Sequence, residues 1–114
     1  MDEEDALLAG HIQEVRRGSV VLACLSELQR PHYGYSLLST LERAGFGVDA
    51  NTLYPLLRRL EKQGLLTSEW NTDEARPRKF YSISPRGEQF LEALTAEWAE
   101  LNTNIRRLLH GRTS

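Results

Sequence analysis

Between residues 51 and 64, apolar and polar side chains recur with the period of an α-helix. One face of this predicted helix is made of four leucines, Leu53, Leu56, Leu57 and Leu60. The opposite face carries Asn51, Pro55, Arg58, Arg59 and Lys62, with Tyr54 and Glu61 at one boundary. Gly64 ends the helix. The pattern predicts a helix that buries its leucines in a core and presents a basic face to solvent.

Two helices are predicted before this segment. Residues 5–29 form the first, with a weak point at Gly18; its early part carries a stripe of Leu8, Ile12 and Val15. Its later part, residues 20–28, is apolar nearly all round and should be buried. Arg30-Pro31-His32 then breaks the chain. The second helix runs from about Tyr35 to Ala44, and Gly45 ends it.

The connector to the basic helix is short. Residues 46–48, Phe-Gly-Val, are expected to pair as a brief strand. Either Asp49 or Asn51 can cap the helix that follows, and the sequence alone leaves this choice open. Pro55 is tolerable there only because it lies near the beginning of the helix.

After Gly64 the pattern changes to short strands. Residues 65–70 and 79–83 are rich in β-branched and aromatic side chains. They flank a polar stretch, residues 71–78, which indicates a hairpin with a long tip. Three cations, Arg76, Arg78 and Lys79, lie on or beside this tip.

The last segment predicts one long helix that begins at Ser84-Pro85, with serine as the cap and proline at the first position. From there apolar residues recur at spacings of three and four: Leu91, Leu94, Trp98, Leu101, Ile105 and Leu108. This heptad seam is too short to be stable alone. Together with the stripe of Leu8, Ile12 and Val15, it predicts a dimer interface.

The order of these elements predicts a mainly α protein with a small β-hairpin. Specifically, it predicts a winged helix-turn-helix with N- and C-terminal dimerisation helices. Residues 1–84 would form the winged helix-turn-helix and residues 85–114 the C-terminal dimerisation helix, as one compact unit.

Composition and charge add the location of the basic surface. The 114-residue chain has a net charge of −2, but residues 51–87 carry seven Lys or Arg against four Asp or Glu. The positive charge is therefore concentrated in the basic helix and the hairpin. The acidic start does not resemble a signal peptide, no apolar run is long enough to cross a membrane, and Cys24 is the only cysteine. These features predict a cytoplasmic protein.

A basic helix beside a basic hairpin is typical of double-stranded DNA binding, because cations neutralise phosphates while Arg and Asn can bond base edges. The predicted contact residues are Asn51, Thr52, Tyr54, Pro55, Arg58, Arg59, Lys62, Arg76, Arg78 and Lys79. Asn51 and Thr52 could instead only cap the helix, Tyr54 could pack against the hairpin, and the arginines could form a solvated surface. A protein-interaction module that never touches DNA is the alternative function.

An enzymatic function finds little support in the sequence. His11, His32 and His110 are scattered, without the spacing of metal ligands, and no glycine-rich phosphate loop follows a strand. Cys24 lies in an apolar run and is most simply a small buried side chain. No metal or cofactor is therefore predicted.

Several ordered motifs resemble the PadR family of bacterial transcriptional regulators. They are Tyr33-Gly34-Tyr35, the run from Thr52 to Glu61, Gly64-Leu65-Leu66 followed by Trp70, Arg78-Lys79-Phe80-Tyr81, and residues 84–87. The resemblance extends from about residue 16 to the C-terminus and is closest to the compact branch with a single C-terminal helix. Tyr33 and Tyr35 are expected to shape the junction between the first two helices.

The resemblance implies a homodimer built by the N- and C-terminal helices. It also implies a repressor of nearby genes that binds a two-fold symmetric operator and, in some members, responds to small aromatic or hydrophobic compounds. Trp98 could pack in the dimer seam, or with its symmetry mate it could form walls for a flat ligand.

Overall fold

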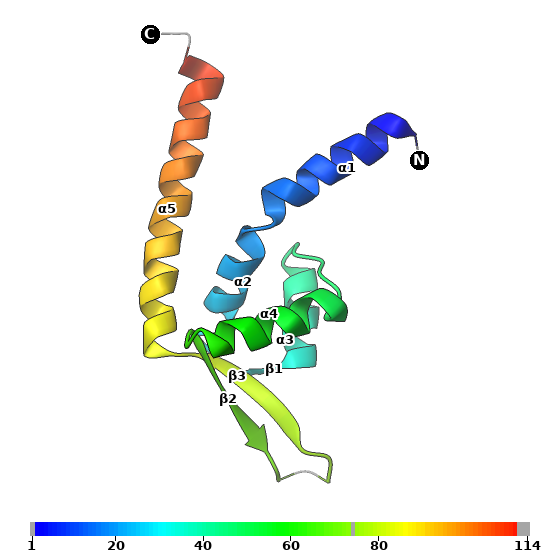
Figure 1. Ribbon diagram of the computed structural model, residues 1–114, viewed down its shortest axis with the longest axis vertical. Helices are drawn as coiled ribbons and strands as arrows, with labels where there is room; N and C mark the ends of the chain where they lie inside the picture. Colours follow the sequence, from blue (N-terminus) through cyan, green and yellow to red (C-terminus); the bar gives the residue numbers. More distant parts are fainter. Residues whose placement is uncertain (1, 74, 112–114) are drawn as a thin grey trace.

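The structure, a computed structural model, describes residues 2–73 and 75–111 (Figure 1). Its elements in chain order are α1 (Glu3–Arg16), α2 (Ser19–Glu27), β1 (His32–Tyr33), α3 (Gly34–Arg43), α4 (Ala50–Lys62), β2 (Leu66–Asn71), β3 (Arg78–Ile83) and α5 (Pro85–His110). The predicted winged helix-turn-helix is confirmed, with α3 and α4 as its helical pair and β2–β3 as its wing.

The helix predicted over residues 5–29 is two helices, and the break falls at the predicted weak point. Asp2 caps α1, because its carboxylate accepts a hydrogen bond from the Asp5 backbone N–H at 2.8 Å. None of the α1 residues is buried, whereas α2 buries Cys24 and Leu25 completely. Figure 1 shows α1 leaning away from the rest of the molecule after the break.

The sheet has three antiparallel strands in the order β1-β3-β2. The wing strands pair along their whole length, from Leu66 opposite Ile83 to Asn71 opposite Arg78. The predicted brief strand at residues 46–48 is wrong, because that segment has no strand pairing. Phe46 and Val48 instead pack against the core as half-buried side chains. The third strand is His32–Tyr33, which pairs with β3 directly after Pro31.

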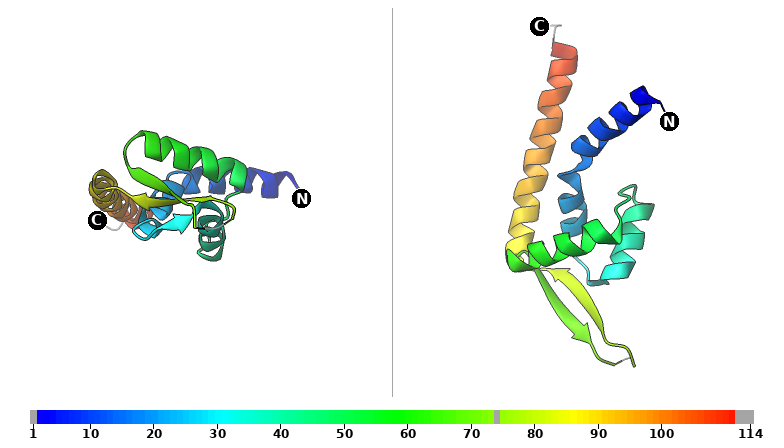
Figure 2. Two further views of the ribbon diagram at one scale, coloured as in Figure 1. Left: turned by 90° about the horizontal axis from the view of Figure 1, so that it is seen from below. Right: turned by 45° about the vertical axis from the view of Figure 1, so that its right-hand side comes forward.

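The core lies where α2, α3 and α4 meet the wing (Figure 2). In the right-hand view, α4 crosses between α5 and α3 while the wing projects below it. The buried residues of the core are Cys24, Leu25, Leu28, Leu37, Leu41, Leu53, Leu56, Leu57, Leu60, Leu65, Leu66 and Tyr81. Complete burial of one leucine contributes roughly 1.5–3 kcal/mol, so this cluster can hold the domain together within one protomer.

The start of α5 is fastened to the wing. Ser84 caps the helix by accepting a hydrogen bond from the Gly87 backbone N–H at 2.9 Å, and its hydroxyl donates to the Gly64 carbonyl oxygen at 2.6 Å. Gly87 has no room for a side chain, because a Cβ there would lie 2.1 Å from the Leu65 carbonyl oxygen. This close approach sets the direction in which α5 leaves the domain.

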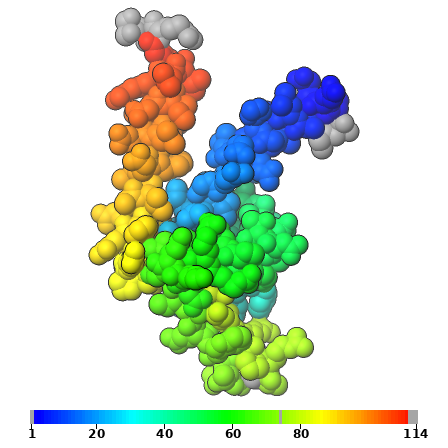
Figure 3. All heavy atoms as spheres, in the orientation of Figure 1, coloured from blue at the N-terminus to red at the C-terminus, as the bar shows by residue number. Residues whose placement is uncertain are grey.

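Only the first turns of α5 are covered by the same chain. Leu91 and Leu94 are half-buried against the core, whereas Trp98, Leu101, Ile105, Leu108 and Leu109 are exposed. The helix runs for 26 residues, and the molecule is 61 Å long as a result. Within the described residues, neither α5 nor another helix is apolar enough to cross a bilayer. In Figure 3 the outer parts of α1 and α5 stand apart with no chain between them.

Candidate nucleic-acid interface

The two faces predicted for residues 51–64 are both present in α4. Leu53, Leu56, Leu57 and Leu60 are buried, and the basic residues Arg58, Arg59 and Lys62 are exposed. The open question of the cap is settled by geometry: the Asp49 carboxylate accepts a hydrogen bond from the Thr52 backbone N–H at 2.8 Å. Asn51 is therefore not the cap and lies exposed in the first turn. Pro55 is also exposed, and α4 continues through it without a break.

One edge of α4 is fixed to its neighbours. Tyr54 is half-buried and packs against the start of α3, where a Cβ on Gly34 would lie 2.6 Å from its Cε1. Tyr54 thus packs against α3, whereas the sequence offered contact with DNA or packing against the hairpin as its alternatives. Further along this edge, the Glu61 carboxylate accepts a hydrogen bond from the Ser68 hydroxyl and pairs with the Lys79 ammonium at 3.4 Å. Glu61 therefore connects α4 to both wing strands.

The other edge of α4 faces the N-terminal helix across an open groove of about 890 Å³. Thr52, Pro55 and Arg59 line it from α4, and residues of α1, α2 and the connector line the other sides. Arg58 and Lys62 do not line this groove. The exposed face of α4 is thus divided into a central part with Asn51, Arg58 and Lys62 and a groove side with Arg59.

The wing cations occupy three different settings. Arg76 is exposed in the loop between β2 and β3. Arg78 begins β3, and its guanidinium lies over the rings of Tyr33 and Tyr35, 5.6 and 5.1 Å from their centroids. Lys79 pairs with Glu61 and lies over the Tyr81 ring at 5.4 Å. Only Arg76 is located on the tip itself.

Cys24, the single cysteine, is buried in the core. Burial raises the pKa of the Cys24 thiol to about 12, so this side chain stays protonated and behaves as the small apolar residue that the sequence predicted. In the described part of the chain, no three His, Cys, Asp or Glu side chains gather as metal ligands would.

Sequence reasoning missed two groups of residues. Phe90 and Leu109 are exposed on α5, and Leu7 is exposed on α1, close to the predicted seam residues. The sequence places Asn71 in the polar tip and predicts no contact for it. In the structure, Asn71 donates a hydrogen bond from its Nδ2 to the Tyr33 hydroxyl oxygen at 2.6 Å. The period of the helices could have revealed the first group. The contact between Asn71 and Tyr33 joins residues far apart in the sequence, so no local pattern predicts it.

The helices α3 and α4 pack together, α4 exposes a basic face, and the β2–β3 hairpin is fixed beside it. This arrangement defines a winged helix-turn-helix of the kind that binds nucleic acid. The model of the transcriptional regulator PadR-like family matches residues 21–93. The chain belongs to this family of transcriptional regulators, as the motifs in its sequence indicated.

Individual relatives agree with this assignment. The transcriptional regulator Rv3488 of Mycobacterium tuberculosis is 35% identical over 103 residues, which cover 90% of this chain and 94% of that protein. A crystal structure of a PadR family transcriptional regulator from Eggerthella lenta is 42% identical, with a TM-score of 0.89 over 93% of this chain and 95% of its own. A PadR-like transcriptional regulator from Bacillus cereus is 28% identical, with a TM-score of 0.70 over 87% and 96%. Each of these three proteins is a transcriptional regulator.

Proposed function

We propose that this protein is a homodimeric repressor that binds a two-fold symmetric DNA operator near the genes it controls. The observation that carries this proposal is the exposed basic face of α4, opposite its buried leucines and beside the wing. A helix of this shape fits the major groove, where its central side chains reach base edges and its flanking cations reach phosphates. Because the proposed target is genomic DNA, we propose that the protein acts in the cytoplasm.

The proposed roles follow from the position of each residue. Arg58 and Asn51, in the central part of the exposed face, would contact bases. Lys62 at the end of the helix and Arg59 on the groove side would contact phosphates. Thr52, Tyr54 and Pro55 would border the groove of the DNA near the start of α4. On the wing, Arg76 is exposed in the loop and would contact a phosphate or the minor groove. Arg78 and Lys79, at the start of β3, would lie farther from the tip and contact the DNA backbone there.

The proposed dimer interface is the apolar surface that one protomer leaves wholly or partly uncovered. It comprises the α1 residues Leu8, Ile12 and Val15 and the α5 seam Leu91, Leu94, Trp98, Leu101, Ile105 and Leu108. Apolar stripes this long favour self-association, and a two-fold axis would place two α4 helices on one side. In this arrangement the winged helix-turn-helix of residues 1–84 reads the DNA, and its helix α1 joins the C-terminal helix of residues 85–114 in holding the dimer. The two α4 helices would lie about 34 Å apart to enter successive major grooves.

Selection of bound duplexes from random DNA with the purified protein tests this function. We expect the selected sequences to share a two-fold symmetric motif, and their affinity to fall steeply as salt rises, because phosphate contacts release counterions. A protein-interaction module would retain no duplex. Binding that is independent of salt would also contradict the proposal.

We further propose that a flat aromatic or hydrophobic effector binds beside Trp98 and its symmetry mate. Trp98 is 52% exposed on the proposed interface, where a compound could change the distance between the two α4 helices without touching DNA. Such a compound must bind the released form more tightly than the DNA-bound form, because equal binding shifts nothing. The expected result is that titration with flat aromatic compounds quenches tryptophan fluorescence and lowers affinity for the selected duplex.

The matched variant is Trp98→Ala, which keeps Trp70 on the wing as a fluorescent background. Compounds that release DNA from the original protein should fail to release it from a folded, dimeric Trp98→Ala protein. If they release DNA equally well from both, Trp98 only packs in the seam.

A further inference from the structure

The wing is held to the helical part of the domain by contacts at both ends of its loop. Asn71 is the last residue of β2 and Arg78 is the first of β3, and the two are paired in the ladder. Asn71 donates a hydrogen bond to the hydroxyl oxygen of Tyr33, and Arg78 Nη1 donates to the hydroxyl oxygen of Tyr35, each at 2.6 Å. Both residues that bound the loop are therefore attached to tyrosines at the start of α3.

Aromatic contacts reinforce these hydrogen bonds. The rings of Tyr33 and Tyr35 stack with centroids 6.2 Å apart, and the Arg78 guanidinium lies over both. The rings of Tyr33 and Phe80 form a T-shaped pair with centroids 6.0 Å apart. A guanidinium over aromatic rings is attracted by their quadrupoles while its N–H groups still donate, so ring and hydroxyl act together.

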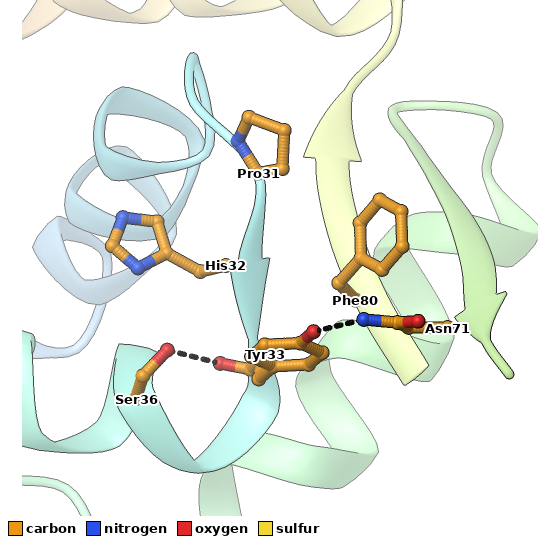
Figure 4. A pocket seen from close by; sticks show the side chains of 6 residues that line it. All are labelled: Pro31, His32, Tyr33, Ser36, Asn71 and Phe80. Carbon is orange, nitrogen blue, oxygen red and sulfur yellow. Dashed lines mark hydrogen bonds between the residues drawn. The ribbon is translucent and has the colours of Figure 1, made fainter. Parts of the chain in front are cut away.

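Close packing does not support the wing at this place. A hollow of about 340 Å³ lies between β1, the start of α3 and the wing; Pro31, His32, Tyr33, Ser36, Asn71 and Phe80 line it. Figure 4 shows the hydrogen bond that joins Tyr33 and Asn71, two of the residues that line it. Beside this hollow, polar and aromatic contacts link the end of the wing to α3, in addition to the apolar area that Leu66 and Tyr81 bury in the core.

We propose that four side chains form an anchor that fixes the wing at a set angle to the helices: Tyr33, Tyr35, Asn71 and Arg78. Asn71 also shapes the loop, because its Oδ1 accepts a hydrogen bond from the Asp73 backbone N–H at 3.0 Å. The anchor holds the Arg76-bearing loop from the α3 side, and Glu61 holds the wing strands from the α4 side. Arg78 thus acts mainly as a positioning residue, and its effect on DNA binding rests on the proposed function.

Amide hydrogen exchange in the free protein tests the anchor without DNA. Tyr35→Ala removes the ring and hydroxyl at an exposed position, and Arg78→Lys keeps the charge but loses the planar group. We expect each change to speed exchange of the wing amides about tenfold, as expected when a charge-assisted hydrogen bond is lost, while core amides of α2 and α4 stay protected. The double variant should be faster than either single variant but by less than the product of the two effects, because both changes remove the contact between Arg78 and Tyr35.

The contrasting variant is Arg76→Ala, which removes a charge from the loop but no anchor contact. It should leave wing exchange unchanged, and with a random-sequence duplex it should reduce the salt dependence of binding. Tyr35→Ala should weaken the same duplex about tenfold with its salt dependence preserved, since no charge is lost. Unchanged wing exchange in both Tyr35→Ala and Arg78→Lys would overturn the anchor. If no duplex binds any variant, the proposed function fails while the exchange result still decides the anchor.

Discussion

Leu101→Asp is expected to abolish the dimer and, with it, binding to the selected duplex. Leu101 is 55% exposed in the middle of the α5 stripe, and in the proposed interface both copies of it become buried. Two carboxylates in one apolar seam would each lose solvation, at a cost on the order of several kcal/mol, and would repel each other. Without its partner the chain leaves α1 and the end of α5 exposed, so we expect it to unfold at lower temperature or aggregate.

Light scattering at micromolar concentration, together with thermal unfolding followed by circular dichroism, measures this outcome. Affinity for a symmetric duplex should fall by at least about a hundredfold, because a monomer binds one half-site without a linked partner to bind the other. The matched control is Thr103→Asp, which adds the same charge to an exposed α5 position off the stripe. It should remain a dimer. A monomeric mass for the unchanged protein would contradict the proposed interface.

The sequence predicts α4 well because helical period fixes which side chains share a face. Once Leu53, Leu56, Leu57 and Leu60 are recognised as one stripe, the exposure of Arg58 and Lys62 follows without further information. The same reasoning locates the exposed seam on α5. It does not reveal that Leu91 and Leu94 are half-buried in their own protomer, since that depends on how α5 leaves the domain past Gly87.

The two errors in strand prediction have a common physical cause. Residues 46–48 have strand-forming side chains but no neighbouring strand edge, and the Phe46 backbone N–H donates to the Leu41 carbonyl oxygen at 2.7 Å instead. His32 and Tyr33 follow a chain-breaking proline, yet β3 offers them an edge to pair with. Strand formation thus depends on a partner that only the tertiary fold supplies.

The wing anchor shows where sequence reasoning stops. Tyr33 and Asn71 are 38 residues apart, and Tyr35 and Arg78 are 43 apart. The sequence predicts that the Tyr-Gly-Tyr motif shapes the helix junction. The contacts of its tyrosines with Asn71 and Arg78 exist only because β3 pairs with both β1 and β2. From the sequence, a basic residue beside a predicted loop indicates a DNA contact. The structure adds that the Arg78 guanidinium lies over the rings of Tyr33 and Tyr35, which the sequence does not predict.

Arg58→Ala is expected to weaken the selected duplex more than random DNA, by about 1–3 kcal/mol, or roughly 5- to 150-fold. Arg58 is exposed at the centre of the α4 face, whose leucines are fixed in the core, so its guanidinium is directed away from the domain. A guanidinium can bond two acceptors of a guanine edge, and losing that pair removes discrimination as well as charge. Arg58→Lys should recover the charge-dependent part of affinity but little of the specificity.

Arg76→Ala on the wing loop is the matched comparison, because it removes the same charge from a position that we expect to follow phosphates. It should weaken selected and random duplexes about equally and lower the salt slope by about one. Fluorescence anisotropy with both duplexes at several salt concentrations separates the two effects. If Arg58→Ala and Arg76→Ala lose equal affinity for both duplexes, base recognition does not reside at Arg58, and α4 serves only to bind the backbone.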